Sequence, residues 1–230
     1  MTENDIWRVI HQKVQEDLWH VLEENPGLAA AVAENPDVRR YFIESEQEKG
    51  TDFLTGLGSR RGFEKDFARE LYTDMRLARP YPVALALIDM DDFRGLNEEL
   101  GHPGADLVLK RLGASIKESV RVSDSAYRYG GDEFALVLPN TTSDGAVSPI
   151  VKIRERSRQA LNQYGSSMSF GIAHYTPENS RDREVVSRHK INEIKEQLLG
   201  NADRALYTIK ESGQKGRICV YREGNFDILD

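Results

Sequence analysis

The sequence predicts an α+β fold: a ferredoxin-like βαββαβ sheet of the palm type, antiparallel or mixed, with flanking helices and a small helical region ahead of it. Two observations predict this fold. From residue 50 onward, short apolar runs alternate with stretches whose apolar residues recur every three to four positions. These segments follow one another as strand, helix, strand, strand, helix, strand, which is the order of a ferredoxin-like sheet with helices on one face.

The composition fits a folded domain and limits the classes of partner. In a chain of 230 residues, 39% hydrophobic and 30% charged residues allow a packed core and argue against wholesale disorder. The formal net charge of −7 argues against a nucleic-acid polymer as partner, because such binders need a basic face. A nucleotide substrate remains compatible, since one metal ion and a few cations neutralise a triphosphate locally.

The chain also lacks the signals of secretion and of membrane insertion. Its single cysteine, Cys219, excludes an internal disulfide and a zinc site built from several cysteines. No basic segment followed by an apolar run is present at the start, and the longest apolar run, residues 83–88, is far too short to cross a bilayer. We therefore expect a cytoplasmic protein that does not engage a membrane.

Residues 1–49 differ in sequence pattern from the rest of the chain and are predicted to form short helices. Their first half carries an apolar stripe at helical spacing: Ile6, Ile10, Val14 and Leu18. Asn-Pro pairs at 25–26 and 35–36 begin new helices, because Asn caps a helix and Pro is tolerated in its first turn. The stripe either packs on the main domain, predicted at 50–230, or serves dimerisation or regulation, and the sequence leaves both open.

The main domain begins with a helix, a strand and a second helix. Residues 62–78 are predicted to be helical from apolar residues four positions apart: Phe63, Phe67, Leu71 and Met75. Residues 83–88 are continuously apolar, as expected of a strand that is buried on both faces. Residues 107–120 have the amphipathic pattern of a helix.

A β-hairpin is predicted next. The two apolar segments 125–129 and 134–138 flank Gly130 and Gly131, a pair that is typical of a tight turn between strands. A helix over 148–163, a strand over 168–174 and a long polar helix over 183–199 that continues to 210 follow. The segment 217–221 is predicted as the final strand.

Acidic residues follow two of these strands. Asp89 and Asp91 come at the end of the apolar strand, and Asp132 and Glu133 follow the glycines of the hairpin. Because the first strand of this arrangement commonly lies beside the third, the two acidic segments should converge at one end of the sheet. Crowded carboxylates repel unless a cation lies among them, and Mg²⁺ binds carboxylate and phosphate oxygens. Helix capping or a solvated turn explains such acids equally well when each segment is taken alone.

Six motifs in order resemble the GGDEF-domain diguanylate cyclase family. Residues 130–134 spell Gly-Gly-Asp-Glu-Phe, the signature of that family. Segments similar to its other motifs occur at 52–61, 89–97, 101–106, 167–173 and 202–207, so the resemblance extends over about residues 51–222. It implies a palm-like catalytic domain.

The resemblance implies a catalytic metal, Mg²⁺ or Mn²⁺, held by the carboxylates of Asp89 and Asp132 and the backbone carbonyl of Met90. Glu133 would assist at the metal, or at the ribose 3′-hydroxyl as the base. Arg128 would stabilise charge during transfer. These roles follow from the family and not from spacing alone.

The residues that the resemblance assigns to GTP are Phe93, Arg94, Asn97, Asp106, Lys210 and Lys215. Backbone N–H groups around the first two would hold the β- and γ-phosphates. Asn97 and Asp106 would bind guanine, although ordinary helix-surface polarity explains them without the family. Lys210 would neutralise the triphosphate, and Lys215 is the candidate replacement for a phosphate-binding Arg at the position of Gln214.

The implied reaction joins two GTP molecules into cyclic di-GMP and releases two pyrophosphates. Each domain binds one GTP, so two sites must face each other in a homodimer. Arg121 and Asp124 occupy the R-x-x-D position at which the family binds cyclic di-GMP as an inhibitor. Two alternatives stay open: a catalytically weak GGDEF domain that acts as a cyclic di-GMP receptor, and a related nucleotidyltransferase that accepts ATP.

Overall fold

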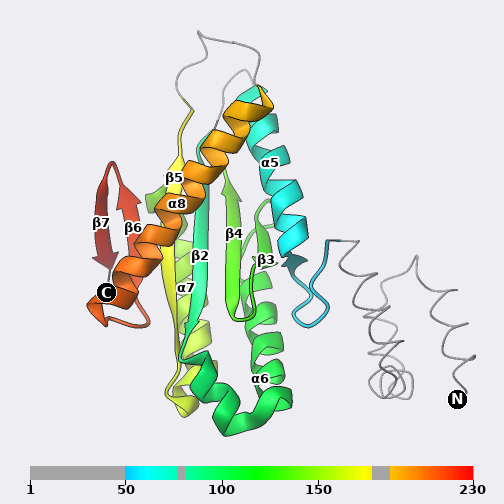
Figure 1. The fold of residues 1–230 in the computed structure, drawn as a ribbon, viewed down its shortest axis with the longest axis vertical. Helices are drawn as coiled ribbons and strands as arrows, with labels where there is room; N and C mark the ends of the chain where they lie inside the picture. The colour runs from blue at the N-terminus through cyan, green and yellow to red at the C-terminus, as the bar shows by residue number, and fades with distance from the viewer. Residues whose placement is uncertain (1–49, 77–80, 178–186, 230) are drawn as a thin grey trace, which may run out of the picture.

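A mixed seven-stranded sheet forms the centre of the protein (Figure 1). The computed structural model describes residues 50–76, 81–177 and 187–229. The predictions for residues 1–49 and for the start of the helix at 183 lie outside these ranges. Within them the strand order is β1-β3-β4-β2-β5-β6-β7. The strands are β1 Gly58–Ser59, β2 Val83–Asp91, β3 Ser125–Arg128, β4 Glu133–Pro139, β5 Ser167–Tyr175, β6 Ile218–Arg222 and β7 Asn225–Leu229.

Strand β2 lies in the middle of the sheet, as its continuous apolar run predicted. It pairs antiparallel with β4 on one side and with β5 on the other. The first strand of the predicted βαββαβ unit therefore does lie beside the third. The four central strands β3-β4-β2-β5 have the ferredoxin-like order, and the predicted fold class is confirmed.

Helices cover both faces of the sheet, which corrects the prediction of helices on one face. The helices are α5 Arg60–Arg76, α6 Phe93–Lys117, α7 Ser143–Leu161 and α8 Arg188–Ser212, with a short 3₁₀ helix at Asn162–Tyr164. Helices α6 and α7 share one core with alternate residues of β2 such as Ala86 and Ile88. Helices α5 and α8 pack on the other face, against Leu85 and Leu87. The extra layer follows from β2, which is apolar on both faces and needs cover on each.

Some element boundaries differ from the prediction. Helix α6 begins at Phe93 and not at 107, because one break at Gly101, where φ is 68°, interrupts an otherwise helical segment. Helix α7 begins at Ser143, where the Thr142 side chain caps it by accepting from the Gly145 N–H at 3.3 Å. The predicted hairpin of β3 and β4 is present.

Strand β6 is not the last strand, so that prediction was wrong. The chain turns at Glu223 and Gly224, both with positive φ, and returns as β7 in an antiparallel pair with β6. The residues of β7 are mostly half-exposed or exposed, so their side chains lack the apolar run by which the other strands were found. None of the described helices is long and apolar enough to span a bilayer.

Candidate active site

The register of the sheet brings the two acidic segments together. Asp89 of β2 lies directly opposite Glu133 of β4, and the Met90 N–H donates to the Asp132 carbonyl at 3.2 Å. Side chains alternate along a strand, and opposite residues of an antiparallel pair share a face. Asp89 and Glu133 therefore both project to the face that carries α5 and α8.

Helix α8 places a lysine side chain beside this cluster of acids. Lys210 lies near the end of α8, and its Nζ contacts Oδ1 of Asp89, 121 positions away in the sequence. The Asp89 side chain is only 14% exposed, whereas the Lys210 side chain is 40% exposed. The lysine therefore covers the buried carboxylate from the solvent side.

The cluster raises the pKa values of two of its acids. Burial is the main cause for Asp89; contact with Lys210 opposes it, and the charges of Asp132 and Asp91 raise the pKa further. For Glu133, partial burial is the main cause of the raised pKa, and repulsion from Asp89 and Asp132 adds to it. The charges of Lys210 and Arg60 oppose this rise. The ionised forms of these carboxyls are thus held at an electrostatic cost that an additional cation would relieve.

The acids form only part of a metal coordination shell. Across residues 50–76, 81–177 and 187–229, no three acidic, histidine or cysteine side chains are grouped as a metal-binding set. The carboxylates of Asp89 and Asp132 and the carbonyl of Met90 are oxygen donors of the kind that a divalent cation takes. Mg²⁺ suits such an incomplete set, because it retains water and takes further oxygens from substrate phosphates.

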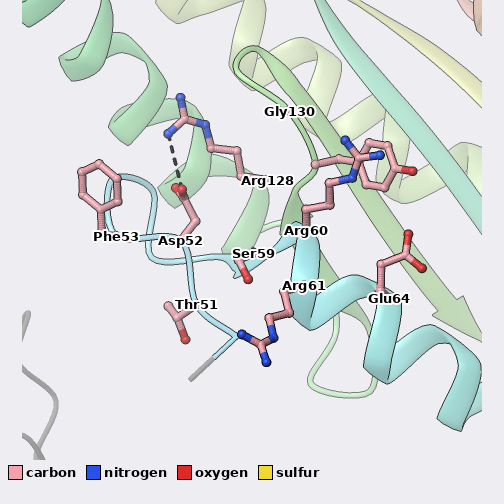
Figure 2. Close-up of a pocket in the computed structure, with 10 residues that line it drawn as sticks. Thr51, Asp52, Phe53, Ser59, Arg60, Arg61, Glu64, Arg128 and Gly130 are labelled. Carbon is pink, nitrogen blue, oxygen red and sulfur yellow. Dashed lines mark hydrogen bonds and ion pairs between the residues drawn. The ribbon is translucent and has the colours of Figure 1, made fainter. Parts of the chain in front are cut away.

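Arg128 shapes the hairpin turn and does not contact the acids. Its Nε and Nη2 donate to the Gly131 carbonyl at 3.1 and 2.7 Å, and its Nη1 donates to Oδ2 of Asp52 at 3.4 Å (Figure 2). Asp52 is also bound by the Thr55 N–H and hydroxyl. The arginine therefore connects the Gly-Gly turn to the loop ahead of α5, a link that the sequence did not predict although Asp52 lies in a quoted motif and Arg128 was named as a catalytic residue.

The first turn of α6 presents backbone donors beside the acids. Asp92 precedes it in the left-handed conformation, at φ 60°, and the first intrahelical bond runs from the Leu96 N–H to the Asp92 carbonyl at 3.1 Å. The N–H groups of Phe93 and Arg94 precede that bond and so have no acceptor within the helix. The Arg94 side chain pairs with Glu98 at 3.0 Å and is 91% exposed. The backbone of this turn is suited to bind an anion.

The break in α6 at Gly101 lies between the two predicted guanine-binding residues, Asn97 and Asp106. Nδ2 of Asn97 donates to the Phe93 carbonyl at 3.0 Å, and its Oδ1 lies 3.1 Å from Nδ1 of His102. Asp106 lies half-buried beyond the break at Gly101. The His102 contact is a feature that the sequence analysis did not predict, although both residues lie in the quoted motifs.

Asp91, two residues after Asp89 on β2, has a structural role that the sequence did not predict. Its side chain accepts from the hydroxyls of Ser167 and Ser169, the latter at 2.8 Å, and from the Gly216 N–H at 3.0 Å. The residue is only 4% exposed. It therefore joins the ends of β2, β5 and β6. The alternation Asp89-x-Asp91 opposite Ser167-x-Ser169 is the sequence signal that marks this structural role.

Within the described ranges, the remaining predicted residues form no hydrogen bond or ion pair with the acids. Asp124 accepts from the Arg121 N–H at 2.9 Å, and the Arg121 side chain is exposed ahead of β3. Lys215 and Gln214 are both exposed in the turn after α8, where the Gln214 N–H donates to the Ser212 hydroxyl at 3.4 Å. Of the predicted cations, Lys210 alone has a recorded contact with the acidic cluster among the described residues.

Comparison with known protein families gives one match over most of the chain. Residues 49–216 match the family described as "Diguanylate cyclase, GGDEF domain". A Bacillus subtilis (strain 168) protein, YhcK, named as uncharacterized, is 35% identical over 174 residues, which are 73% of this chain and 44% of that protein. Diguanylate cyclase DgcS of Shewanella oneidensis is 32% identical over 174 residues, 75% of this chain and 53% of DgcS. The chain thus spans about half the length of these curated relatives.

Solved structures of GGDEF domains share the fold. The GGDEF domain of Caulobacter crescentus DgcB, solved with c-di-GMP, is 26% identical, with a TM-score of 0.59 over 75% of this chain and 93% of that one. The active GGEEF domain of a Vibrio cholerae diguanylate cyclase is also 26% identical, with a TM-score of 0.58 over 72% of this chain and 97% of that one.

Proposed function

Because the chain belongs to the GGDEF diguanylate cyclase family, we propose that it condenses two GTP molecules into cyclic di-GMP and two pyrophosphates. The observation that carries the proposal is the pairing of Asp89 with Glu133 beside Asp132, with Lys210 on the same cluster. Carboxylates and a lysine gathered at an open sheet end suit phosphoryl transfer, which depends on positioning and on charge neutralisation.

Diguanylate cyclases of this family generally depend on a divalent metal. We assign Mg²⁺ or Mn²⁺ to the carboxylates of Asp89 and Asp132 and the carbonyl of Met90, whose mutual repulsion a cation relieves. Such an ion supplies neutralisation of charge on the α-phosphate and on the departing pyrophosphate. Lys210, which contacts Asp89, would bind the triphosphate and neutralise part of its charge.

The chain's own groups account for the other requirements. Glu133, whose pKa is raised by burial and by its acidic neighbours, is placed to accept the proton of the ribose 3′-hydroxyl. The N–H groups of Phe93 and Arg94 bind the β- and γ-phosphates. Asn97 and Asp106 bind guanine, because an acidic acceptor matches its N1–H and N2–H₂ donors and leaves adenine unmatched. Lys215 provides a second cation near the phosphates.

Catalysis by this site requires a homodimer. One domain holds one GTP, and each 3′-hydroxyl attacks the α-phosphorus of the GTP on the facing domain, so that each attack expels one pyrophosphate. Two attacks close the ring of cyclic di-GMP. The exposed Arg121 and the neighbouring Asp124 are proposed to bind the product as an inhibitor, since a guanidinium binds phosphate or guanine bidentately.

The alternative function is a cyclic di-GMP receptor with weak catalysis. One observation favours it: Gln214 stands at the position where the family carries a phosphate-binding cation. The Asp89, Asp132 and Glu133 cluster favours the enzyme, because a receptor has no need of mutually repelling acids with raised pKa values.

Product analysis separates these functions. We expect the purified chain, incubated with GTP and Mg²⁺, to form cyclic di-GMP and two equivalents of pyrophosphate, as measured by chromatography with mass detection. ATP in place of GTP should give no cyclic dinucleotide, because Asp106 does not match adenine. Absence of both products, together with binding of added cyclic di-GMP, would favour the receptor. Equal use of ATP would contradict the role of Asp106.

A further inference from the structure

A cavity of about 550 Å³ lies beside the active site, between the start of α5 and the hairpin turn (Figure 2). Ser59, Arg60 and Arg61 line it from the α5 side, and Arg128 and Gly130 line it from the hairpin. The three acids of the active site do not line it. Its volume falls within the range of small-molecule sites, about 300–1,000 Å³.

Positive charge gathers around this cavity. Arg60 and Arg61 are the first two residues of α5, and the first turn of this 17-residue helix contains no acid. The N-terminus of a helix carries a partial positive charge, so two arginines there are electrostatically unfavourable without an anion. Arg128 adds a third guanidinium to the same cavity.

The acids that line the cavity already have cationic partners. Asp52 is paired with Arg128 at 3.4 Å, and Glu64 is paired with Lys195 of α8. Among the ion pairs formed within the described ranges, none includes Arg60 or Arg61. These two guanidinium groups therefore carry the cavity's positive charge that no described ion pair neutralises, although the Arg60 charge also acts on the nearby Glu133.

Packing holds one of these arginines in place. The Arg60 guanidinium lies over the ring of Tyr129, 4.7 Å from the ring centroid. The Tyr129 ring in turn packs edge-on against the ring of Phe63, a buried residue of α5, with 5.2 Å between ring centroids. A guanidinium stacked in this way loses less conformational freedom when it binds a ligand.

We propose that this cavity binds an anion with two or more linked phosphate groups, with Arg60 and Arg61 as its main charge partners. Figure 2 shows these two side chains leaving the start of α5 in different directions, which favours a ligand that carries more than one anionic group. Because Gly130 forms the opposite wall, the bound anion lies against the turn that carries Asp132 and Glu133. The site is separate from the proposed GTP site and is suited to regulate it.

Calorimetric titration of the whole chain with pyrophosphate, in EDTA and low salt, tests this proposal. We expect the wild-type protein to bind, and the double variant Arg60→Gln/Arg61→Gln to bind at least about tenfold more weakly, as expected for lost charge-assisted contacts. The matched control, Lys65→Gln/Lys117→Gln, removes the same charge from exposed positions outside the cavity and should bind like the wild type. A thermal melt should show every variant folded, because all the replaced side chains are exposed.

A further variant, Lys210→Gln, separates this site from the active site. We expect it to retain wild-type affinity for pyrophosphate, since Lys210 does not line the cavity. Loss of binding in Lys210→Gln, wild-type binding by the Arg60→Gln/Arg61→Gln protein, or no binding by the wild type would each overturn the proposal. The titration contains neither GTP nor metal, so its failure leaves the proposed cyclase activity standing.

Discussion

Replacing Asp89 with asparagine is expected to lower cyclic di-GMP synthesis by on the order of 1,000-fold, because a lost metal carboxylate removes several kcal/mol of charge stabilisation. Asn has nearly the shape of Asp, so the strand pairing of β2 with β4 and β5 should persist. The initial rate of pyrophosphate release at saturating GTP and Mg²⁺ measures the effect.

The same substitution should leave the metal-free protein at least as stable at neutral pH. The pKa of Asp89 is raised in the folded protein, so this carboxyl holds its proton more tightly when folded than when unfolded. Its ionisation therefore destabilises the fold above the folded pKa, and that destabilisation fades as the pH falls through it. Asn does not ionise and removes the effect, although the loss of the half-exposed Lys210 contact offsets part of the gain.

An exposed aspartate provides the matched control for Asp89→Asn. Asp203 lies on the exposed surface of α8, and Asp203→Asn should keep wild-type rate and melting temperature. Retention of more than roughly a tenth of the wild-type rate by Asp89→Asn would show that this carboxylate is not a metal ligand in the reaction.

Replacing Gly171 with alanine is expected to destabilise the protein by about 2–3 kcal/mol, as overpacked cores do. Gly171 lies on β5 where α8 crosses the sheet, and a Cβ there would lie 2.2 Å from the Ala202 carbonyl oxygen and 2.5 Å from the Leu206 nitrogen. Both atoms belong to the backbone of α8, so a side-chain rotation cannot relieve the clash. For a chain of this size the melting temperature should fall by roughly 5–10 °C.

Activity should fall with stability in Gly171→Ala, because α8 must shift away from β5 and it carries Lys210 to Asp89. Gly200→Ala on the same helix is the control: a Cβ there meets nothing within 4 Å. Alanine in a helix interior should raise stability by about 0.5–1 kcal/mol. Scanning calorimetry of both variants measures the two effects. Equal melting temperatures for Gly171→Ala and the wild type would show that the helix does not rest directly on this strand.

Periodicity predicted the elements whose side chains are buried in a regular pattern. The apolar run that became β2 and the Gly130-Gly131 hairpin were both found, because strand burial and turn chemistry are local signals. The early start of α6 was missed because Gly101, with a positive φ, interrupts the helical pattern. Strand β7 was missed because its half-exposed residues follow from pairing with β6, which is a long-range effect.

The contacts of the candidate site also divide into those that the sequence predicts and those that it does not. The meeting of Asp89 with Asp132 and Glu133 was expected from strand order, since register follows from the pairing of neighbouring strands. Spacing alone does not predict the contact of Lys210 with Asp89, which depends on how α8 lies on the sheet. The hydrogen bonds of Arg128 to Gly131 and Asp52 could not be predicted from the sequence either, because the sequence does not show which acceptor an arginine side chain reaches.

Anomalous diffraction from crystals soaked with Mn²⁺ and a non-hydrolysable GTP analogue tests most directly whether Asp89 and Asp132 share one cation. We expect an anomalous peak within about 2.5 Å of a carboxylate oxygen of both residues and of a phosphate oxygen, as hard divalent ions require. A peak elsewhere on the protein, or bound nucleotide with no peak between these two side chains, would contradict the proposed metal site and the mechanism built on it.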